Sequence, residues 1–372
     1  IFVGTVYFFT RDVKLVIALL IFTSPAELGL ATPLVTIAAI ARAAREGILI
    51  KGGLFLEELA KVTTIVFDKT GTLTIGSPIV NKVEIIDPNY NEQKLVQFAA
   101  TVDRRSSHPL AKAILSYADK LKLTYGEPEN FEVIKGRGVS AKVQGKSILL
   151  GNKLFMEENK TPLFNSSENV TDTVIYLSIE SKLAGIFYIS DAIREGAKEM
   201  IRGLRKSGIK NIVMLTGDNP ETAKYVSNQI GITDYRANLL PEDKINIIKE
   251  LQKDGSKVAM VGDGINDAPA LVQANIGIAM GAMGTETAME AADIVLMQDK
   301  LEKIAKARAI SKRAYRTIRE NIFVGVGVVH VIGITLVLLK IIGPIEAAAI
   351  HLLPDTLVFI NSIKLLRIKI DA

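Results

Sequence analysis

The hydrophobic positions of the chain follow two different patterns, and the first is a set of long apolar runs. These runs lie near residues 13–41, 322–342 and 345–366. A helix that crosses a membrane needs about 20 apolar residues, so each run predicts a membrane-spanning helix. The last run is the weakest, because His351, Pro354 and Asp355 interrupt it. The alternative for each run is a buried helix of a water-soluble protein.

The second pattern fills residues 60–310, where short apolar segments alternate with helical stretches. The short segments "TTIVFD", "NIVMLTGD", "KVAMVGDG", "IGIAMG" and "DIVLM" have the length of buried strands. The stretch "PEDKINIIKELQKDG" predicts a helix with Ile245, Ile248 and Leu251 on one face and Pro241 near its start. This alternation is typical of a parallel sheet with crossover helices, which binds ligands at the carboxyl ends of its strands.

Residues 78–185 depart from this alternation and show β-like segments with turns, such as "GRGVSAKVQGKSILLGN". At least one helix is expected after His108, with Pro109 in its first turn and Ser106 or Ser107 as its N-cap. We interpret this region as a domain inserted after the first strand of the parallel sheet.

Composition supports a protein with a membrane part and an aqueous part. Hydrophobic residues make up 48% of the 372 residues and charged residues 23%, and the mean hydropathy is +0.27. The formal net charge of +5 does not indicate nucleic-acid binding, because much of the positive excess clusters beside the apolar runs. The chain has no cysteine, which excludes disulfides and thiolate metal sites.

Basic residues flank one side of each apolar run. They are Arg42, Arg45 and Lys51 after the first run, Lys312, Arg313, Arg316 and Arg319 before the second, and Lys364, Arg367 and Lys369 after the third. The loop "GPIEAA" between the last two runs has none. Because basic residues favour the cytoplasmic side of a membrane, we expect the large middle region and the C-terminus to lie in the cytoplasm.

Acidic residues follow three of the predicted strands. Asp68 opens "DKTGTLT" at the end of the first, where a carboxylate can act as a nucleophile. The other two strands end in "TGD" (Thr216–Asp218) and in "GDGINDAP", which holds Asp263, Asn266 and Asp267. Oxygen ligands of this kind are those that Mg²⁺ prefers, and Lys244 could neutralise a transferring phosphoryl group. One such turn is usually an ordinary loop, but three of them indicate a phosphate site.

Together, "DKTGTLT", "TGD" and "GDGINDAPAL" resemble the phosphorylation domain of P-type ATPases, a branch of the haloacid-dehalogenase-like fold. The resemblance covers essentially the whole chain and implies that Asp68 accepts the γ-phosphate of ATP. The catalytic residues that it implies are Asp68, Thr70, Thr216, Gly217, Asp218, Lys244, Asn266 and Asp267, and the implied Mg²⁺ ligands are Asp68, Asp263 and the carbonyl of Thr70.

The same resemblance implies an α/β, Rossmannoid phosphorylation domain with an inserted α+β nucleotide-binding domain and transmembrane helices. The expected parts are membrane helices at 1–45, a phosphorylation domain at 46–77 and 186–312, a nucleotide-binding domain at 78–185, and the last two membrane helices at 313–372. No "TGE" loop of an actuator domain occurs. We therefore expect the ATPase to be incomplete here, with the actuator domain and the first helices in a missing N-terminal part.

Thr70 favours a pump over a phosphatase on chemical grounds. Phosphatases of this fold carry Asp-x-Asp, whose second acid protonates the leaving group and activates water, and Thr70 occupies that position here. Without a general base, hydrolysis of an aspartyl phosphate is expected to be slow. A membrane-tethered phosphatase of the same fold and a catalytically silent nucleotide-binding scaffold are the two alternatives.

"SSHPLAKAI" and "KGRGV" are together similar to the nucleotide-binding domain of the heavy-metal subgroup of P-type ATPases. In that subgroup a Ser-Glu-His-Pro motif and a Gly-x-Gly turn hold the adenine. The resemblance implies an ATP pocket lined by Asp103, His108, Gly136, Gly138 and Gly151. Ser107 stands where the family has Glu, so no adenine contact is expected from it. The alternative for His108 by itself is a structural histidine.

"PAELGLATP" is similar to the ion-site helix of the same subgroup, which usually carries Cys-Pro-Cys or Ser-Pro-Cys. An acid inside a membrane is a functional-site hypothesis, and its alternative is a kinked helix with Glu27 at an aqueous end. The candidate ligands of a transported ion are Ser24, Glu27, His330, His351 and Asp355. Oxygen and imidazole ligands disfavour Cu(I) and suit borderline or harder divalent ions. His330 has an alternative as a core histidine that donates to a backbone carbonyl.

The sequence thus predicts ATP-driven transport of a metal cation, by an integral membrane protein of a prokaryotic cell membrane with cytoplasmic domains. Its expected cofactors are ATP and Mg²⁺. Its expected partners are the transported metal cation, the lipid bilayer and the missing N-terminal part, with no nucleic acid.

Overall fold

The computed structural model describes residues 1–24, 28–163, 173–263, 267–281 and 286–367. The chain divides into two compact units. The first unit consists of Ile1–Phe67, Gly196–Val213 and Pro241–Ala372, and the second of Asp68–Glu195 and Met214–Leu240. This division differs from the four predicted parts, because the first unit joins the apolar helices to most of the parallel sheet. The four-part division stays a prediction.

A seven-stranded sheet with the order β1-β13-β12-β11-β2-β9-β10 contains the predicted short strands. The strands are β1 (Ile48–Ile50), β2 (Thr64–Asp68), β9 (Asn211–Leu215), β10 (Asp234–Arg236), β11 (Val258–Gly262), β12 (Ile276–Met280) and β13 (Ile294–Leu296). Strands β2, β11, β12 and β13 pair in parallel. Every residue of β2, β11 and β12 is buried, which is why these segments are continuous apolar runs.

Several helices of the first unit lie next to the strands of this sheet along the chain. They are α4 (Gly53–Lys61), α8 (Ala197–Lys206), α10 (Pro241–Lys253), α11 (Ala268–Gln273) and α12 (Glu286–Ala291). The predicted helix over "PEDKINIIKELQKDG" is α10, which begins at Pro241 and buries Ile248 completely.

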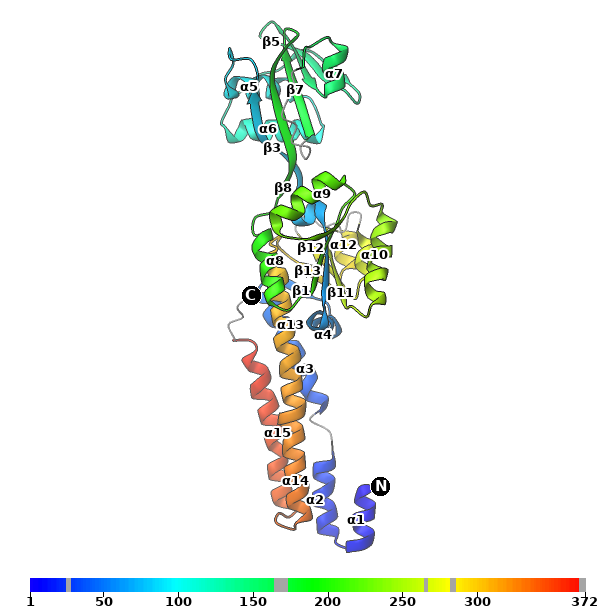
Figure 1. Ribbon diagram of the computed structural model, residues 1–372. Helices are drawn as coiled ribbons and strands as arrows, with labels where there is room; N and C mark the ends of the chain where they lie inside the picture. The colour runs from blue at the N-terminus through cyan, green and yellow to red at the C-terminus, as the bar shows by residue number, and fades with distance from the viewer. Residues whose placement is uncertain (25–27, 164–172, 264–266, 282–285, 368–372) are drawn as a thin grey trace. The chain divides into compact units, whose positions relative to one another are not determined.

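The remaining helices of the first unit form a bundle (Figure 1). They are α1 (Phe2–Thr10), α2 (Val13–Thr23), α3 (Leu28–Arg45), α13 (Glu302–Glu320), the π-helical segment η2 (Asn321–Val328), α14 (Val329–Leu338) and α15 (Pro344–Lys364). Helix α2 packs on α14 and α15, and α3 packs on α13 and α15. The bundle thus brings the first apolar run of the sequence into contact with the last two.

Among the described residues, one helix is both long and apolar enough to cross a membrane. It runs through α13, η2 and α14 from Glu302 to Leu338, with a mean hydropathy of 2.2 over its most apolar window. Helix α2 is a shorter apolar helix. The apolar run at 13–41 therefore contains two helices, and residues 25–27 between them lie outside the described part.

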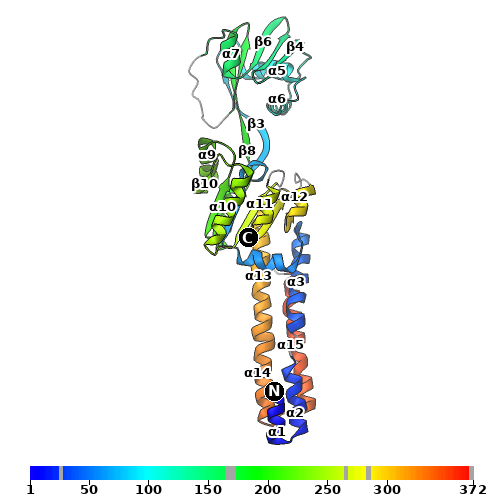
Figure 2. The ribbon, with the colours of Figure 1, turned by 90° about the vertical axis from the view of Figure 1, so that its right-hand side faces the viewer.

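The second unit contains an antiparallel sheet with the order β3-β8-β7-β6-β5-β4. Its strands are β3 (Thr74–Ile85), β4 (Glu129–Ile134), β5 (Gly138–Val143), β6 (Lys146–Gly151), β7 (Thr173–Ile179) and β8 (Lys182–Ile193), and its helices are α5 (Glu92–Asp103), α6 (Pro109–Lys120), α7 (Lys153–Glu158) and α9 (Pro220–Ile230). Helices α5 and α6 cover one face of the sheet (Figure 2).

Alternating side chains of this sheet form two apolar clusters, one on each face. Phe187 packs with α5 and α6, whereas its neighbours Ile186 and Tyr188 pack on the other face with Phe155 of α7. This period of two is what an antiparallel strand covered on both faces requires. The β-rich region that was predicted after the first strand of the parallel sheet is thus present, as an antiparallel sheet.

The N-cap of α6 is His108, so the prediction of Ser106 or Ser107 was wrong. The His108 backbone is extended, and its Nδ1 accepts a hydrogen bond from the Leu110 N–H at 3.3 Å. Ser106 Oγ instead accepts from the N–H of His108 at 3.3 Å. Pro109 lies in the first turn as predicted, where the missing N–H costs no helical hydrogen bond.

Replacement of Phe187 by Ala should destabilise the antiparallel sheet by about 3–5 kcal/mol, because it removes a fully buried ring. Hydrogen exchange with mass spectrometry should show faster exchange in β7 and β8. The control is Val133→Ala, because Val133 is 61% exposed and should change stability by less than about 0.5 kcal/mol. Equal effects of the two variants would contradict this assignment of the core.

Candidate active site

The pairing of β2 with β11 fixes the carboxyl ends of two neighbouring parallel strands. Phe67 stands opposite Val261, and Asp68 is the next residue of β2, only 5% exposed. On β11, Gly262 ends the strand and Asp263 follows it. Both acids therefore follow directly after paired, buried strand residues, as the sequence predicts for the tips of a parallel sheet.

In the first unit, Lys244 and Asp267 form a buried ion pair. The distance from Lys244 Nζ to Asp267 Oδ1 is 2.7 Å, and the two residues are 8% and 1% exposed. A Cβ atom on Gly262 would lie 3.0 Å from Asp267 Oδ2, so glycine leaves room for this carboxylate beside the end of β11. The structure therefore brings two predicted catalytic residues together.

In the second unit, the turn Lys69–Leu73 follows Asp68, and Gly71 takes the positive φ of 71° that its turn requires. Lys69 Nζ lies 2.5 Å from Asp218 Oδ2. Thr216 is buried, and its Oγ1 accepts from the Asp218 N–H at 3.1 Å. The exposed Thr70 belongs to the same turn. Sequence reasoning chose Asp218 but missed its partner Lys69, although Lys69 lies within the "DKTGTLT" motif.

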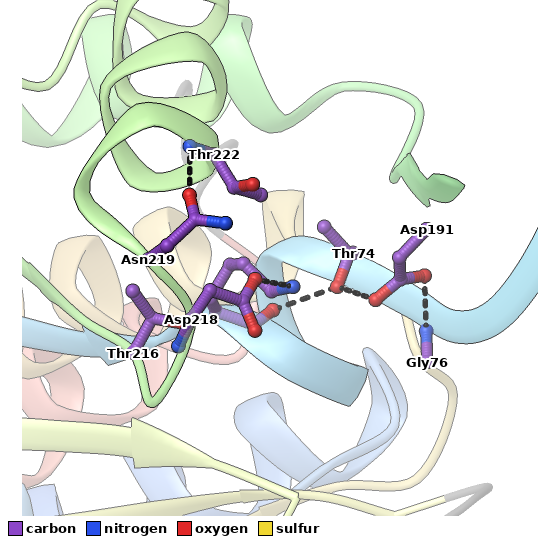
Figure 3. A network of polar contacts seen from close by, with 8 residues as sticks. Thr74, Gly76, Asp191, Thr216, Asp218, Asn219 and Thr222 are labelled. Atoms are coloured by element: carbon purple, nitrogen blue, oxygen red, sulfur yellow. Dashed lines mark hydrogen bonds and ion pairs between the residues drawn. The ribbon is translucent and has the colours of Figure 1, made fainter. Parts of the chain in front are cut away.

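A second network ties this turn to β8 (Figure 3). The Thr74 hydroxyl lies 2.9 Å from the carbonyl oxygen of Lys69 and 2.5 Å from Asp191 Oδ2, and the Gly76 N–H donates to Asp191 Oδ1 at 2.9 Å. Arg194 Nη2 donates to the Gly71 carbonyl at 2.8 Å. Sequence reasoning missed Asp191 and Arg194, because their only signal is an acid and a base near the end of a β-like run.

The predicted nucleotide residues line one cavity of the second unit, with a volume of about 440 Å³. All five are present in its wall: Asp103, His108, Gly136, Gly138 and Gly151. Gly138 and Gly151 face each other across β5 and β6, where a Cβ atom on Gly151 would lie 2.5 Å from the Arg137 carbonyl oxygen. The two glycines thus let the strands approach closely beside the cavity.

Asn152 also lines this cavity and was missed by sequence reasoning. Its Nδ2 donates to the Gly136 carbonyl at 2.9 Å, and its Oδ1 accepts from the Phe155 N–H at 3.0 Å as the N-cap of α7. Asn152 therefore fixes the Gly136 turn to the start of a helix. The signal was an Asn directly before a short helix.

His108 and Asp103 are two polar groups in the wall of the cavity. Because His108 Nδ1 accepts from Leu110, the proton of the neutral ring lies on Nε2, which is then a donor. Burial raises the pKa of Asp103 from its ordinary value of 3.8 to about 7. A protonated carboxyl can both donate and accept, so this pair offers complementary groups to a heterocyclic base.

The candidate ligands of a transported ion are only partly brought together. The rings of His330 and His351 lie with centroids 5.5 Å apart, and His330 Nδ1 lies 2.8 Å from the Val326 carbonyl oxygen. Ser24 is exposed at the end of α2. Among the described residues no group of three or more His, Asp or Glu gathers, so Asp355 does not complete such a group. Glu27, like Asn266 of the phosphate site, lies outside the described residues.

Comparison with known proteins agrees with this arrangement. The haloacid dehalogenase-like hydrolase family matches residues 62–275, and a second family with the same description matches residues 245–307. The first match covers more than half of the chain.

The chain belongs to the haloacid dehalogenase-like hydrolase family.

The curated relatives of the chain include heavy-metal P-type ATPases, and the resemblance drawn from the motifs is confirmed. A manganese-exporting P-type ATPase of Mycobacterium leprae is 37% identical over 369 residues, which are 97% of this chain and 51% of that protein. A cadmium-transporting ATPase of Staphylococcus aureus is 37% identical over 363 residues, 95% of this chain and 50% of that protein. The chain spans about half the length of these relatives.

A solved structure confirms the predicted fold class. A zinc-transporting PIB-type ATPase in its E2.Pi state superposes with a TM-score of 0.83 and 34% identity, covering 92% of this chain and 56% of that one. The catalytic domain of a CPx-ATPase matches with a TM-score of 0.55 and 33% identity, covering 73% of this chain and 98% of that one.

The raised pKa of Asp103 predicts a pH-dependent stability of the second unit. Between about pH 4 and pH 7 the folded state holds a proton that the unfolded state has lost, so the free energy of unfolding falls as the pH rises. The total loss should be about 4 kcal/mol, because each pKa unit is worth about 1.4 kcal/mol. Hydrogen exchange of β5 and β6 across this pH range measures it.

Asp103→Asn should remove this slope, while Glu132→Gln on the exposed side of β4 should keep it. An unchanged slope in Asp103→Asn would show that the buried carboxyl is not its cause.

Lys244→Met should destabilise the first unit by about 3–5 kcal/mol, because it leaves the buried Asp267 carboxylate without this ammonium group. The double variant Lys244→Met/Asp267→Leu should lose less than the sum of the two single losses. Lys249→Met, on the exposed face of α10, is the matched control and should change stability by less than about 0.5 kcal/mol. Urea unfolding measures all four, and additive losses would contradict the pairing.

Proposed function

We propose that this chain is the catalytic and ion-binding portion of a P-type ATPase that couples ATP hydrolysis to transport of a heavy-metal cation. The observation that carries the proposal is the buried Asp68 at the carboxyl end of β2. Relatives with 37% identity export manganese or transport cadmium. A divalent heavy-metal ion is therefore the proposed cargo.

The proposed chemistry begins with in-line attack of an Asp68 carboxylate oxygen on the γ-phosphorus of ATP. The bond from that phosphorus to the β–γ bridging oxygen breaks, and ADP leaves. Thr70 and Thr216 are proposed to contact the phosphoryl group, with Gly217 and Asp218 completing that turn. Lys244, held by Asp267 at 2.7 Å, is proposed to stabilise the negative charge on the transferring group. Asn266 is proposed to order the site.

The residues present fit a magnesium ion. Asp68, Asp263 and the Thr70 carbonyl are the proposed ligands, because carboxylate and carbonyl oxygens are the hard donors that Mg²⁺ prefers. Bound there, Mg²⁺ would neutralise charge on the phosphate oxygens. The Lys69–Asp218 pair would keep the neighbouring turn in place, because each charge is balanced by the other.

The cavity lined by Asp103, His108 and the three glycines is the proposed site of the adenine ring. The surface of its wall is mostly apolar, with several polar side chains among the lining residues, which suits a heterocycle. The Nε2–H of His108 and the carboxyl of Asp103 supply a donor and a donor–acceptor group for the edge of the base.

A membrane position is supported by the bundle of the first unit. Large apolar side chains are exposed on its outside, for example Phe323, Val331 and Leu352, whereas Asn321 Nδ2 donates to Ser362 Oγ inside it at 3.1 Å. A lipid environment favours helices with apolar side chains on the outside of the bundle and hydrogen bonds between polar side chains inside it. We propose a prokaryotic cell membrane with the sheets in the cytoplasm, as the basic flanks indicate.

The test is phosphoenzyme formation from [γ-³²P]ATP with Mg²⁺. The protein should acquire an acid-stable, hydroxylamine-sensitive label, and Asp68→Asn should abolish it, because an amide cannot form the acyl phosphate. Asp254→Asn, in the exposed loop after α10, is the control and should label normally. Equal labelling of Asp68→Asn, or rapid hydrolysis of small phosphate esters regardless of ATP, would refute the proposal.

A further inference from the structure

Two hollows on the surface of the bundle share one composition, with basic side chains next to exposed apolar ones. The first, which we call the α15 hollow, has a volume of about 370 Å³ and is lined by Phe359, Ile360, Ile363, Lys364 and Arg367. The second, the α13 hollow, has a volume of about 380 Å³ and is lined by Tyr315, Arg316, Arg319, Glu320, Phe323 and Val324. Both hollows belong to the first unit.

Hydrogen bonds inside the bundle place the two hollows at the same level along it. Asn321 Nδ2 donates to Ser362 Oγ at 3.1 Å, and Asn361 Nδ2 donates to Asn321 Oδ1 at 2.9 Å. Asn321 and Ser362 are each only 2% exposed. The residues of the α13 hollow lie on both sides of Asn321 in the chain, and those of the α15 hollow lie on both sides of Ser362. The basic residues of the two helices therefore lie at one end of the bundle.

In both hollows a cation lies one helical turn from an exposed apolar side chain. Helical residues four positions apart share a face, so Lys364 lies above Ile360, and Arg319 lies above Phe323. The Arg319 guanidinium is 5.9 Å from the centroid of the Phe323 ring. Phe323 is 65% exposed and Ile360 is 49% exposed. Each helix thus presents an apolar surface that ends at a positive charge, which matches the acyl chain and the charged headgroup of a single lipid.

The charge of the α15 hollow is complementary to an anion. The described residues that line it include two cations, Lys364 and Arg367, and no carboxylate. In the α13 hollow, Arg316 Nε lies 2.8 Å from Glu320 Oε1, so an acid offsets one of its two positive charges. Each basic residue near an anionic membrane surface is worth about fivefold in binding, and a guanidinium can donate two parallel hydrogen bonds to a phosphate. The α15 hollow is therefore the stronger of the two candidates.

We propose that the α15 hollow binds an anionic phospholipid of the cytoplasmic leaflet, and that the α13 hollow is a second, weaker site for the same lipid class. Lys364 and Arg367 hold the phosphate of the headgroup, and an acyl chain lies against Phe359 and Ile360. The occupant is a phospholipid rather than a free phosphate, because the cations and the exposed apolar side chains line one hollow. The inference rests on the membrane position in the proposed function, and it does not depend on phosphoryl transfer or on the cargo.

The first experiment uses the absence of tryptophan from the chain, because one introduced indole then reports on one place. The Phe359→Trp variant is reconstituted into vesicles with brominated phosphatidylglycerol or brominated phosphatidylcholine, whose bromine atoms quench indole fluorescence on contact. Phosphatidylglycerol should bind at this position about fivefold to 25-fold more strongly than phosphatidylcholine. Leu352→Trp is the matched control, because Leu352 is 64% exposed on the same helix, about two turns away. The two lipids should quench it equally.

The second experiment removes the charges in the Phe359→Trp background. Lys364→Gln/Arg367→Gln should bring the ratio of the two lipid affinities close to one. Lys249→Gln/Lys253→Gln makes the same change of charge on exposed residues of α10, which line neither hollow, and should leave the ratio unchanged. An unchanged ratio in the first double variant, or an equal preference in Leu352→Trp, would overturn the proposal.

Glycerol 3-phosphate separates a lipid from a free phosphate, because it carries the phosphate without acyl chains. An excess of it should leave the preference for phosphatidylglycerol unchanged. Loss of the preference would show that the hollow binds a free phosphate and would overturn the lipid assignment.

Phosphorylation by [γ-³²P]ATP, measured on the same preparations, separates this inference from the proposed function. Labelled protein without a preference for the anionic lipid would refute the lipid site alone. Absence of label in the wild type, with the predicted lipid preference, would support the lipid site and count against the proposed phosphoryl transfer.

Discussion

The parallel pairing of β2 with β11 is the constraint on which the rest of the molecule depends. All residues of both strands are buried, so every backbone polar group in them must find a partner in the sheet. The register that satisfies them sets Thr64 opposite Val258 and Phe67 opposite Val261. A shift by one residue would turn every side chain to the opposite face. Burial of the strands thus fixes the strand ends at which Asp68 and Asp263 lie.

The charged side chains near the strand ends form lysine–aspartate ion pairs. A buried ammonium or carboxylate without a counter-charge costs several kcal/mol, and Lys244 meets Asp267 while Lys69 meets Asp218. Each pair joins segments that are far apart in the chain, 23 residues in one case and 149 in the other. Within each unit, the pairing therefore fixes the position of a lysine ammonium group beside a carboxylate.

Sequence reasoning succeeded where the signal was local and periodic. The five strand segments, α10 and the inserted β-rich region follow from runs of apolar residues and from helical spacing. It failed at the start of α6, because the preference for serine at N-caps is only statistical. Here the side chain that accepts the hydrogen bond of the Leu110 N–H is His108.

The partners of Asp191 and Phe22 could not be identified from the sequence. Asp191 meets Thr74 across 117 residues of sequence, and Phe22 meets two histidines on other helices. Such contacts depend on the packing of complete elements, so a single sequence contains no periodicity that reports them.

The helix from Glu302 to Leu338 connects the parallel sheet to the paired histidines as one continuous element. At its start Arg308 donates to the Leu59 carbonyl and to Ser207 Oγ, each at 3.0 Å, which fixes the helix to α4 and to the end of α8. Near its other end it carries His330. The π-helical segment Asn321–Val328 lies between the two, and such segments are rare and frequently lie at functional sites. The contacts of Arg308 therefore hold the start of this helix against helices next to the sheet, while its far half packs against the other helices of the bundle.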